Sequence, residues 1–211
     1  SEAGSPFNVT VVPGSTSATA SKVYGDGLCV ARAGREATFR VQAYDALGNK
    51  KTDSHDDFRF SVNGADDPSS MTAIGGGMYE GAYVVDRAGP LRVAVSFRGE
   101  AVGGSGEGCA VAAGPPASFI VRGPGAADGD EVAAGADHFV TADAFDEFGN
   151  PAAVSDTDGV DAFNLTAVVD GVVKSSRAFT RVTGSTMRST FTLSDVTVNE
   201  VTRLVLVDDA S

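Results

Sequence analysis

The 211-residue sequence contains no tryptophan, three methionines, two histidines and two cysteines. Two cysteines are too few for the disulfide-dense framework of a small secreted domain, and with no histidine nearby they are too few for a structural zinc site. No apolar run approaches the roughly 20 residues that a membrane-spanning helix needs, so membrane insertion is not expected. The first six residues show neither the basic nor the apolar region of a signal peptide.

Basic residues are also scarce, with 16 Lys and Arg against 28 Asp and Glu, which gives a net charge of −12. Most of the excess lies in the second half, because residues 13–112 carry a net −2 and residues 113–211 a net −9. Acidic surfaces repel phosphate backbones, so nucleic acid is not an expected partner. The acidity serves solubility or, in a second interpretation, faces a basic protein surface.

An internal repeat organises the chain. The segment Ala43–Asn49, with the sequence AYDALGN, returns as AFDEFGN at Ala144–Asn150, an offset of 101 residues. Gly34 and Gly135 match at the same offset. About 100 residues is the size of one immunoglobulin-like sandwich, so the spacing predicts two tandem domains.

Apolar and polar residues alternate in both halves, as in strands with one buried face. The pattern is clear at Phe39, Val41 and Ala43 and again over Leu91–Phe97. Twenty-six glycines and eight prolines punctuate the chain, and no segment of ten or more residues has helical spacing. The sequence therefore predicts an all-β chain of antiparallel sandwiches.

Several segments together resemble a known family, the filamin repeat. The matching segments of the first half are Gly4–Val11 (the family's last strand), Ser21–Leu28 (its first strand), Ala43–Asn49 with Asp56–Phe58, Gly77–Tyr79, Ala88–Leu91 and Gly103–Ser105. The second half matches less, because it retains Gly123–Gly125, Gly135 and Asp146–Asn150 but lacks the Gly-x-Tyr and Ala-Gly-x-Tyr signatures. The resemblance implies two tandem immunoglobulin-like, filamin-type β-sandwiches.

The expected boundaries are residues 13–112 for the first repeat and 113–211 for the second, divergent one. Residues 1–12 are interpreted either as the last strand of a preceding repeat or as a strand donated to the second repeat, in the same chain or in a neighbouring one. An unpaired sheet edge favours association, which is the basis of the second interpretation.

The resemblance also implies a partner-binding edge, because filamin repeats accept a partner's strand along the third and fourth strands of the sandwich. An edge offers unpaired N–H and C=O groups, and alternate side chains give selectivity. The residues implied here are Phe58, Phe60, Val62, Met71, Ile74, Phe163, Leu165 and Phe179. An edge that is only solvated or covered by a neighbouring repeat is the alternative.

Two kinds of covalent modification are compatible with the sequence. Cys29 and Cys109 would lie on segments that run side by side in immunoglobulin-like folds, so they form either a disulfide or two buried free thiols. Asn8 and Asn164 begin Asn-x-Thr sequons and would be glycosylated if the protein is secreted.

No catalytic residues, cofactor or metal site are predicted. Neither histidine pairs with a nucleophile in a known motif, and the acidic stretch at 156–161 lacks the spacing of a calcium loop. The expected function is a non-catalytic scaffold or spacer of a larger cytoskeletal or ciliary protein, bound to protein partners or to neighbouring repeats. The alternative is an extracellular adhesion module of a cell or gamete surface.

Overall fold

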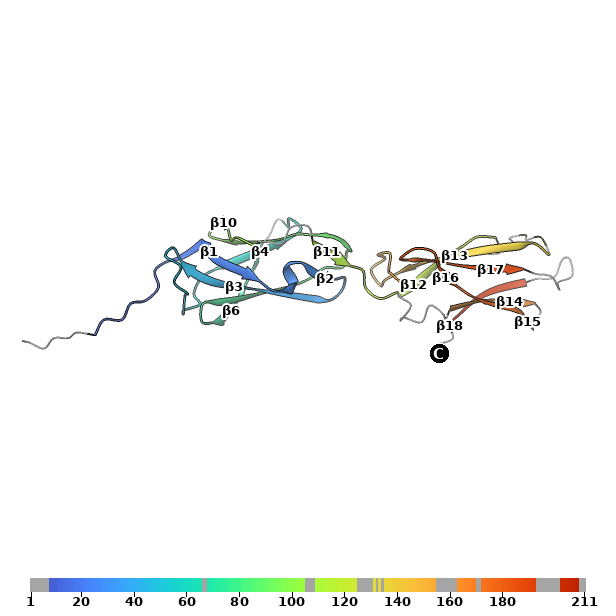
Figure 1. Cartoon of the computed structure of the whole chain (residues 1–211), viewed down its shortest axis with the longest axis horizontal. Helices are drawn as coiled ribbons and strands as arrows, with labels where there is room; N and C mark the ends of the chain where they lie inside the picture. The colour runs from blue at the N-terminus through green and yellow to red at the C-terminus, as the bar shows by residue number, and fades with distance from the viewer. Residues whose placement is uncertain are drawn as a thin grey trace, which may run out of the picture. The chain divides into compact units, whose positions relative to one another are not determined.

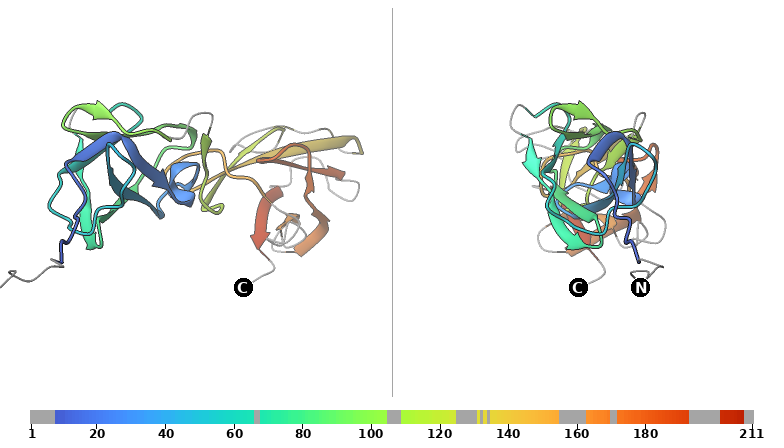
Figure 2. Two further views of the ribbon diagram at one scale, coloured as in Figure 1. Left: turned by 60° about the vertical axis from the view of Figure 1, so that its left-hand side comes forward. Right: turned by 90° about the vertical axis from the view of Figure 1, so that its left-hand side faces the viewer.

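The computed structural model describes residues 8–65, 68–104, 109–124, 131, 133, 135–154, 163–169, 172–192 and 202–208. The chain divides into two compact units, unit 1 (residues 1–112) and unit 2 (residues 113–211). In Figure 1 unit 1 runs from blue to green and unit 2 from yellow-green to red, and Figure 2 gives two further views. The elements of the described residues are strands, apart from one 3-10 turn, so the all-β immunoglobulin-like class is confirmed.

Unit 1 has two layers. The strands of the first layer are β1 (Thr16–Tyr24), β3 (Glu36–Asp45), β7 (Met78–Val84) and β6 (Thr72–Gly75), hydrogen-bonded in the order β1-β3-β7-β6. The second layer contains β10 (Glu100–Ala101), β9 (Val93–Phe97), β4 (Phe58–Val62) and β5 (Ser69–Ser70), in the order β10-β9-β4-β5. A three-stranded sheet is formed by β2 (Val30–Arg32), β11 (Cys109–Ala112) and β8 (Gly89–Leu91), with β11 in the centre. The turn η1 (Asp26–Leu28) lies between β1 and β2.

The core of unit 1 forms where the alternating apolar residues of both layers meet. Phe39 packs edge-on against Phe60, with ring centroids 5.2 Å apart. Phe58 lies 4.8 Å from Tyr79 and 4.9 Å from Phe97 by the same measure. All five rings are buried. Burying side chains of this size stabilises the fold by about 1.5–3 kcal/mol each, so this aromatic cluster is the main contact between the layers.

The Phe39 ring packs directly over Gly81 of β7, where the absence of a side chain leaves room for it. A Cβ atom at Gly81 would lie 2.5 Å from Cζ of Phe39. Any larger residue would therefore displace the ring from the centre of the aromatic cluster.

The apolar alternation over Leu91–Phe97 predicts one continuous strand, but the structure divides it into β8 and β9 at Arg92. The cause lies in the turn after β4. Asn63 donates its N–H to the carbonyl of Arg92 at 2.8 Å, and its side-chain oxygen accepts the N–H of Arg92 at 2.8 Å. Both backbone groups of Arg92 thus bond to one turn residue.

Unit 2 repeats this arrangement in its described residues. Its first sheet has the order β12-β13-β17-β16 and comprises β12 (Ser118–Arg122), β13 (Asp137–Phe145), β17 (Thr186–Thr192) and β16 (Thr180–Arg181). Its second sheet has the order β15-β14-β18 and comprises β15 (Val172–Ala178), β14 (Phe163–Val169) and β18 (Thr202–Asp208). Val140, Ala142 and Ala144 of β13 are fully buried, so the alternation that marked β3 also defines the core face here.

Among the described residues, no helix has the length and apolar content that a membrane span requires.

Candidate functional site

The loop after β3 is held together by the carboxylate of Asp45. Its Oδ1 accepts the N–H groups of Leu47 at 3.0 Å and Asn49 at 2.8 Å. Its Oδ2 accepts the side-chain amide of Asn49 at 2.9 Å and the N–H of Gly14 at 2.8 Å. The bonds from Asn49, and then the one from Gly14, lower the pKa of Asp45 to about 2. Asp45 therefore joins a local turn to the chain that enters unit 1.

The same arrangement occurs in unit 2 at Asp146. Its Oδ1 accepts the N–H groups of Phe148 and Asn150, and its Oδ2 accepts the N–H of Gly114 at 2.8 Å. Burial raises the pKa of Asp146, but the hydrogen bonds from Asn150 and Gly114 outweigh it, and the net pKa lies below the usual value. In each unit, one aspartate thus accepts a hydrogen bond from the glycine that precedes the first strand.

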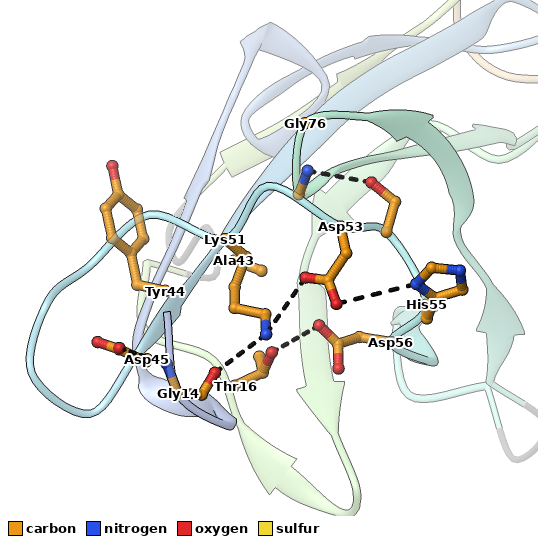
Figure 3. A network of polar contacts seen from close by, with 12 residues as sticks. Gly14, Thr16, Ala43, Tyr44, Asp45, Lys51, Asp53, His55, Asp56 and Gly76 are labelled. Atoms are coloured by element: carbon orange, nitrogen blue, oxygen red, sulfur yellow. Dashed lines mark hydrogen bonds and ion pairs between the residues drawn. The ribbon is translucent and has the colours of Figure 1, made fainter. Parts of the chain in front are cut away.

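A second contact holds Gly14 from the other side, as Figure 3 shows. Lys51 donates to the carbonyl of Gly14 at 3.0 Å and pairs with Asp53 at 3.2 Å. Nearby, the hydroxyl of Thr16 donates to Asp56 at 2.6 Å. The hydrogen bond from Lys51 lowers the pKa of Asp53. These contacts fix both polar groups of the Gly14 backbone, so the direction of the entering chain is set by unit 1.

Cys29 and Cys109 form a disulfide in unit 1. Cys29 directly precedes β2 and Cys109 begins β11, and these strands pair in parallel, with Val30 opposite Ala110. The two Cα atoms are 4.8 Å apart, within the range that a disulfide spans. The bridge closes a loop with a sequence separation of 80, which stabilises the folded state by roughly 4.5 kcal/mol in the chain-entropy model.

The partner edge implied for unit 1 needs correction, because its residues do not lie along one edge. Phe58 and Phe60 are buried in the core, and β4 lies between β9 and β5. Val62 and Met71 pack against the same core. Ile74 lies on β6, at the edge of the other sheet, and is 40% exposed. β5 pairs with Arg59 and Phe60 of β4, so among the strands that carry the implied residues β6 is the one at a sheet edge.

In unit 2 the implied residues again lie in different places. Phe163 and Leu165 are in β14, which lies between β15 and β18 and so is no edge strand. Phe179 is 1% exposed and belongs to the core, which also corrects its expected role as a contact residue. Within the described part of unit 2, the edge strands are β12, β16, β15 and β18.

The two sequons differ in setting. Asn8 is exposed and precedes the first strand, whereas Asn164 lies in β14, opposite Ala178 of β15 and Val207 of β18. The acidic stretch at 156–161 lies outside the described residues. Among those that are described, no three His, Cys, Asp or Glu side chains gather in a way that would hold a metal ion.

Residues 15–106 match the model of the Filamin/ABP280 repeat. Unit 1 is a filamin-type repeat. This family is structural and non-enzymatic, and repeats of its type mediate protein interactions. None of the curated proteins is a significant match to the chain.

Two solved bacterial structures resemble the chain over both units. The Escherichia coli adhesin FdeC is 24% identical, with a TM-score of 0.58, over 95% of this chain and 64% of the FdeC chain. Invasin, a bacterial integrin-binding protein, is 18% identical, with a TM-score of 0.55, over 87% of this chain and 36% of its own. At these identities the likeness shows the shared fold. The chain spans less than two thirds of either protein.

The sequence interpretation missed the glycine contacts of Asp45 and Asp146. An Asp-x-x-Gly-Asn segment is typical of a local turn, and such a turn accounts for only part of the hydrogen bonds that each carboxylate accepts. A signal was present, because Gly14 and Gly114 precede their aspartates by 31 and 32 residues. That near-constant interval is a second spacing that the two units share.

Proposed function

We propose that the chain is a non-catalytic spacer and adhesion module that works outside the cytosol, and that its partners are proteins. The observation that carries this proposal is the bridge between Cys29 and Cys109. Cytosolic reductants keep protein thiols reduced, whereas disulfides persist in secreted and cell-surface proteins. Of the two locations expected from the sequence, the bridge favours the extracellular surface over the cytoskeleton or cilium.

The position of the bridge suits a spacer. Cys109 begins β11, and the chain leaves unit 1 at the end of that strand. The bridge therefore ties the exit of unit 1 to the start of β2. Tension along the chain would pass from β1 through the two sulfurs to β11, without reaching the strands between them. The fold shared with the adhesin FdeC and with invasin supports this role.

Protein binding through a strand edge is retained in the proposal, with β6 in place of the edge first expected. All four residues of β6 are exposed, and β6 pairs on one side with β7. An extended segment of a partner protein would add beside β6 and contact Ile74. In a cell-adhesion assay with protein-coated beads, Ile74→Asp is expected to reduce binding. Val84→Asp, a matched change at an apolar residue that is 59% exposed, should not. Equal binding by both variants contradicts the role of β6.

Surface labelling tests the proposed location. Cells that make the protein are treated with an amine-reactive biotin reagent that does not cross membranes, before and after lysis. Lys51 is engaged in contacts, but Lys22 and Lys50 offer further amines. The proposal predicts labelling on intact cells, with a cytosolic protein of the same cells unlabelled. Labelling that appears only after lysis would place the chain in the cytosol. That result would favour the alternative function, a scaffold of a larger cytoskeletal or ciliary protein.

A further inference from the structure

A cavity lies at one end of the second layer of unit 1. Its volume is about 330 Å³, near the lower limit of small-ligand pockets, which are about 300–1,000 Å³. Its lining includes the loop at 55–57 that leads into β4, the outward-facing residues Arg59 of β4 and Ser96 of β9, and the turn Arg98–Gly99. A cavity of this size takes one small molecule or one sugar residue.

The turn at the rim of the cavity contains an arginine in an unusual backbone conformation. Arg98 and Gly99 join β9 to β10, and both have positive φ, 52° at Arg98 and 83° at Gly99. Two-residue hairpin turns with positive φ at both positions favour asparagine followed by glycine. Among the described residues, the other non-glycine residue with positive φ is Asn63, and asparagine adopts this conformation readily. The backbone does not favour an arginine here, so its side chain must account for its presence.

The side chain of Arg98 is positioned by an aromatic ring. Its guanidinium carbon lies 5.1 Å from the centroid of the Phe97 ring. Stacking on a ring holds a guanidinium in place, while the N–H groups in its plane remain able to donate. Among the described residues, Arg98 forms no ion pair with a carboxylate. Arg98 is therefore a positioned cation that can bind an anion in the cavity.

The other charged side chains of the cavity already have partners. Arg59 donates Nε to Asp57 at 3.1 Å, and Thr16 donates its hydroxyl to Asp56 at 2.6 Å. Figure 3 shows this contact of Asp56, with His55 beside it in the same loop. An ionised carboxylate has about four acceptor sites, so Asp57 retains sites for hydroxyl groups. An ammonium group at Asp57 would face the like charge of Arg59. The cavity thus offers a cation for an acid group and acceptors for hydroxyls.

We propose that the cavity binds an acidic sugar, with one carboxylate and neighbouring hydroxyls, either free or as a residue of a glycan. Arg98 would bind the carboxylate through two N–H groups, and Asp57 and the hydroxyl of Ser96 would bind the sugar hydroxyls. The chain has a net charge of −12, so binding of an acid depends on a local cation such as Arg98. This ligand is additional to the protein partners proposed above, and β6 contributes no residue to the cavity.

An NMR titration of the isotope-labelled 211-residue protein with glucuronate tests the proposal. Glucuronate is expected to shift the backbone amide signals of Ser96, Arg98 and Gly99 in a saturable way. Glucose has the hydroxyls without the carboxylate, and glutamate has carboxylates without the hydroxyls. Each should bind at least about tenfold more weakly, because one set of hydrogen bonds is lost. Methyl glucuronide distinguishes the two sources: binding equal to that of glucuronate identifies a glycan residue, and weaker binding identifies a free sugar acid.

The substitution Arg98→Asn separates binding from folding. Asparagine suits this turn, so the variant should remain folded, with amide signals away from the cavity unchanged, and should bind glucuronate at least about tenfold more weakly. Arg35→Asn removes the same charge from an exposed residue outside the cavity and should bind like the wild type. A wild type without saturable shifts overturns the proposal. So does a folded Arg98→Asn variant that binds like the wild type, or glutamate or glucose that binds as tightly as glucuronate.

Discussion

Reduction of the bridge between Cys29 and Cys109 should change how far unit 1 extends under force. With the bridge intact, residues 30–108 lie inside a covalent loop, and the two ends of that loop are 4.8 Å apart between Cα atoms. Once the bridge is reduced, the same ends are separated by 80 residue steps. At about 3.3–3.6 Å for each extended residue, the gain in contour length on unfolding is about 26–28 nm.

Single-molecule stretching with and without reductant measures this gain directly. Both cysteines lie in unit 1, so the unfolding step of unit 2 is an internal control and must not change with reductant. We expect one unfolding step that lengthens by about 26–28 nm after reduction and one that stays constant. Identical steps under both conditions would refute the view that the bridge carries the tension past the strands it encloses.

Two further predictions concern stability. The folded-state pKa of Asp45 is about 2, below the usual 3.8, so its hydrogen bonds stabilise unit 1 fully above about pH 4 and are lost as the pH falls toward 2. Asp45→Asn should therefore lower the melting temperature at pH 5 and do so less at pH 2.5, and a difference that is the same at both pH values would contradict this. Gly81→Ala should destabilise unit 1 by about 1–3 kcal/mol because its Cβ meets the Phe39 ring. In the same urea titration, Gly103→Ala, whose Cβ would meet nothing within 4 Å, should change stability by less than about 0.5 kcal/mol.

Local patterns were sufficient to predict the fold class and the filamin-type family. Alternation of apolar residues reports which face of a strand is buried, and the 101-residue offset of the Asp-x-x-Gly-Asn loops reports the repeat. The alternation lies within short stretches, and the repeat is visible because the same seven-residue motif occurs twice. The aromatic cluster around Phe58 follows from the same alternation, since its inward-facing positions carry the rings.

The order of strands in the sheets was the part that the sequence could not supply. Alternation at Phe58 and Phe60 is the same for a central strand and for an edge strand, so it did not show that β4 lies between β9 and β5. The contacts of Gly14 and Gly114 span more than 30 residues and have no local signature. The sequence also left the state of Cys29 and Cys109 open, because proximity of two thiols does not fix the redox compartment.

We have proposed that unit 1 is a bridged filamin-type repeat of a protein that works outside the cytosol. Thiol trapping on protein from its native source tests it most directly, with alkylation in denaturant before and after reduction, followed by peptide mapping. We expect that neither cysteine is alkylated before reduction, that both are alkylated after it, and that the unreduced map contains a linked peptide pair holding Cys29 and Cys109. Alkylation of both cysteines without reduction would show that the native protein lacks the Cys29–Cys109 bridge and would contradict the proposed location outside the cytosol.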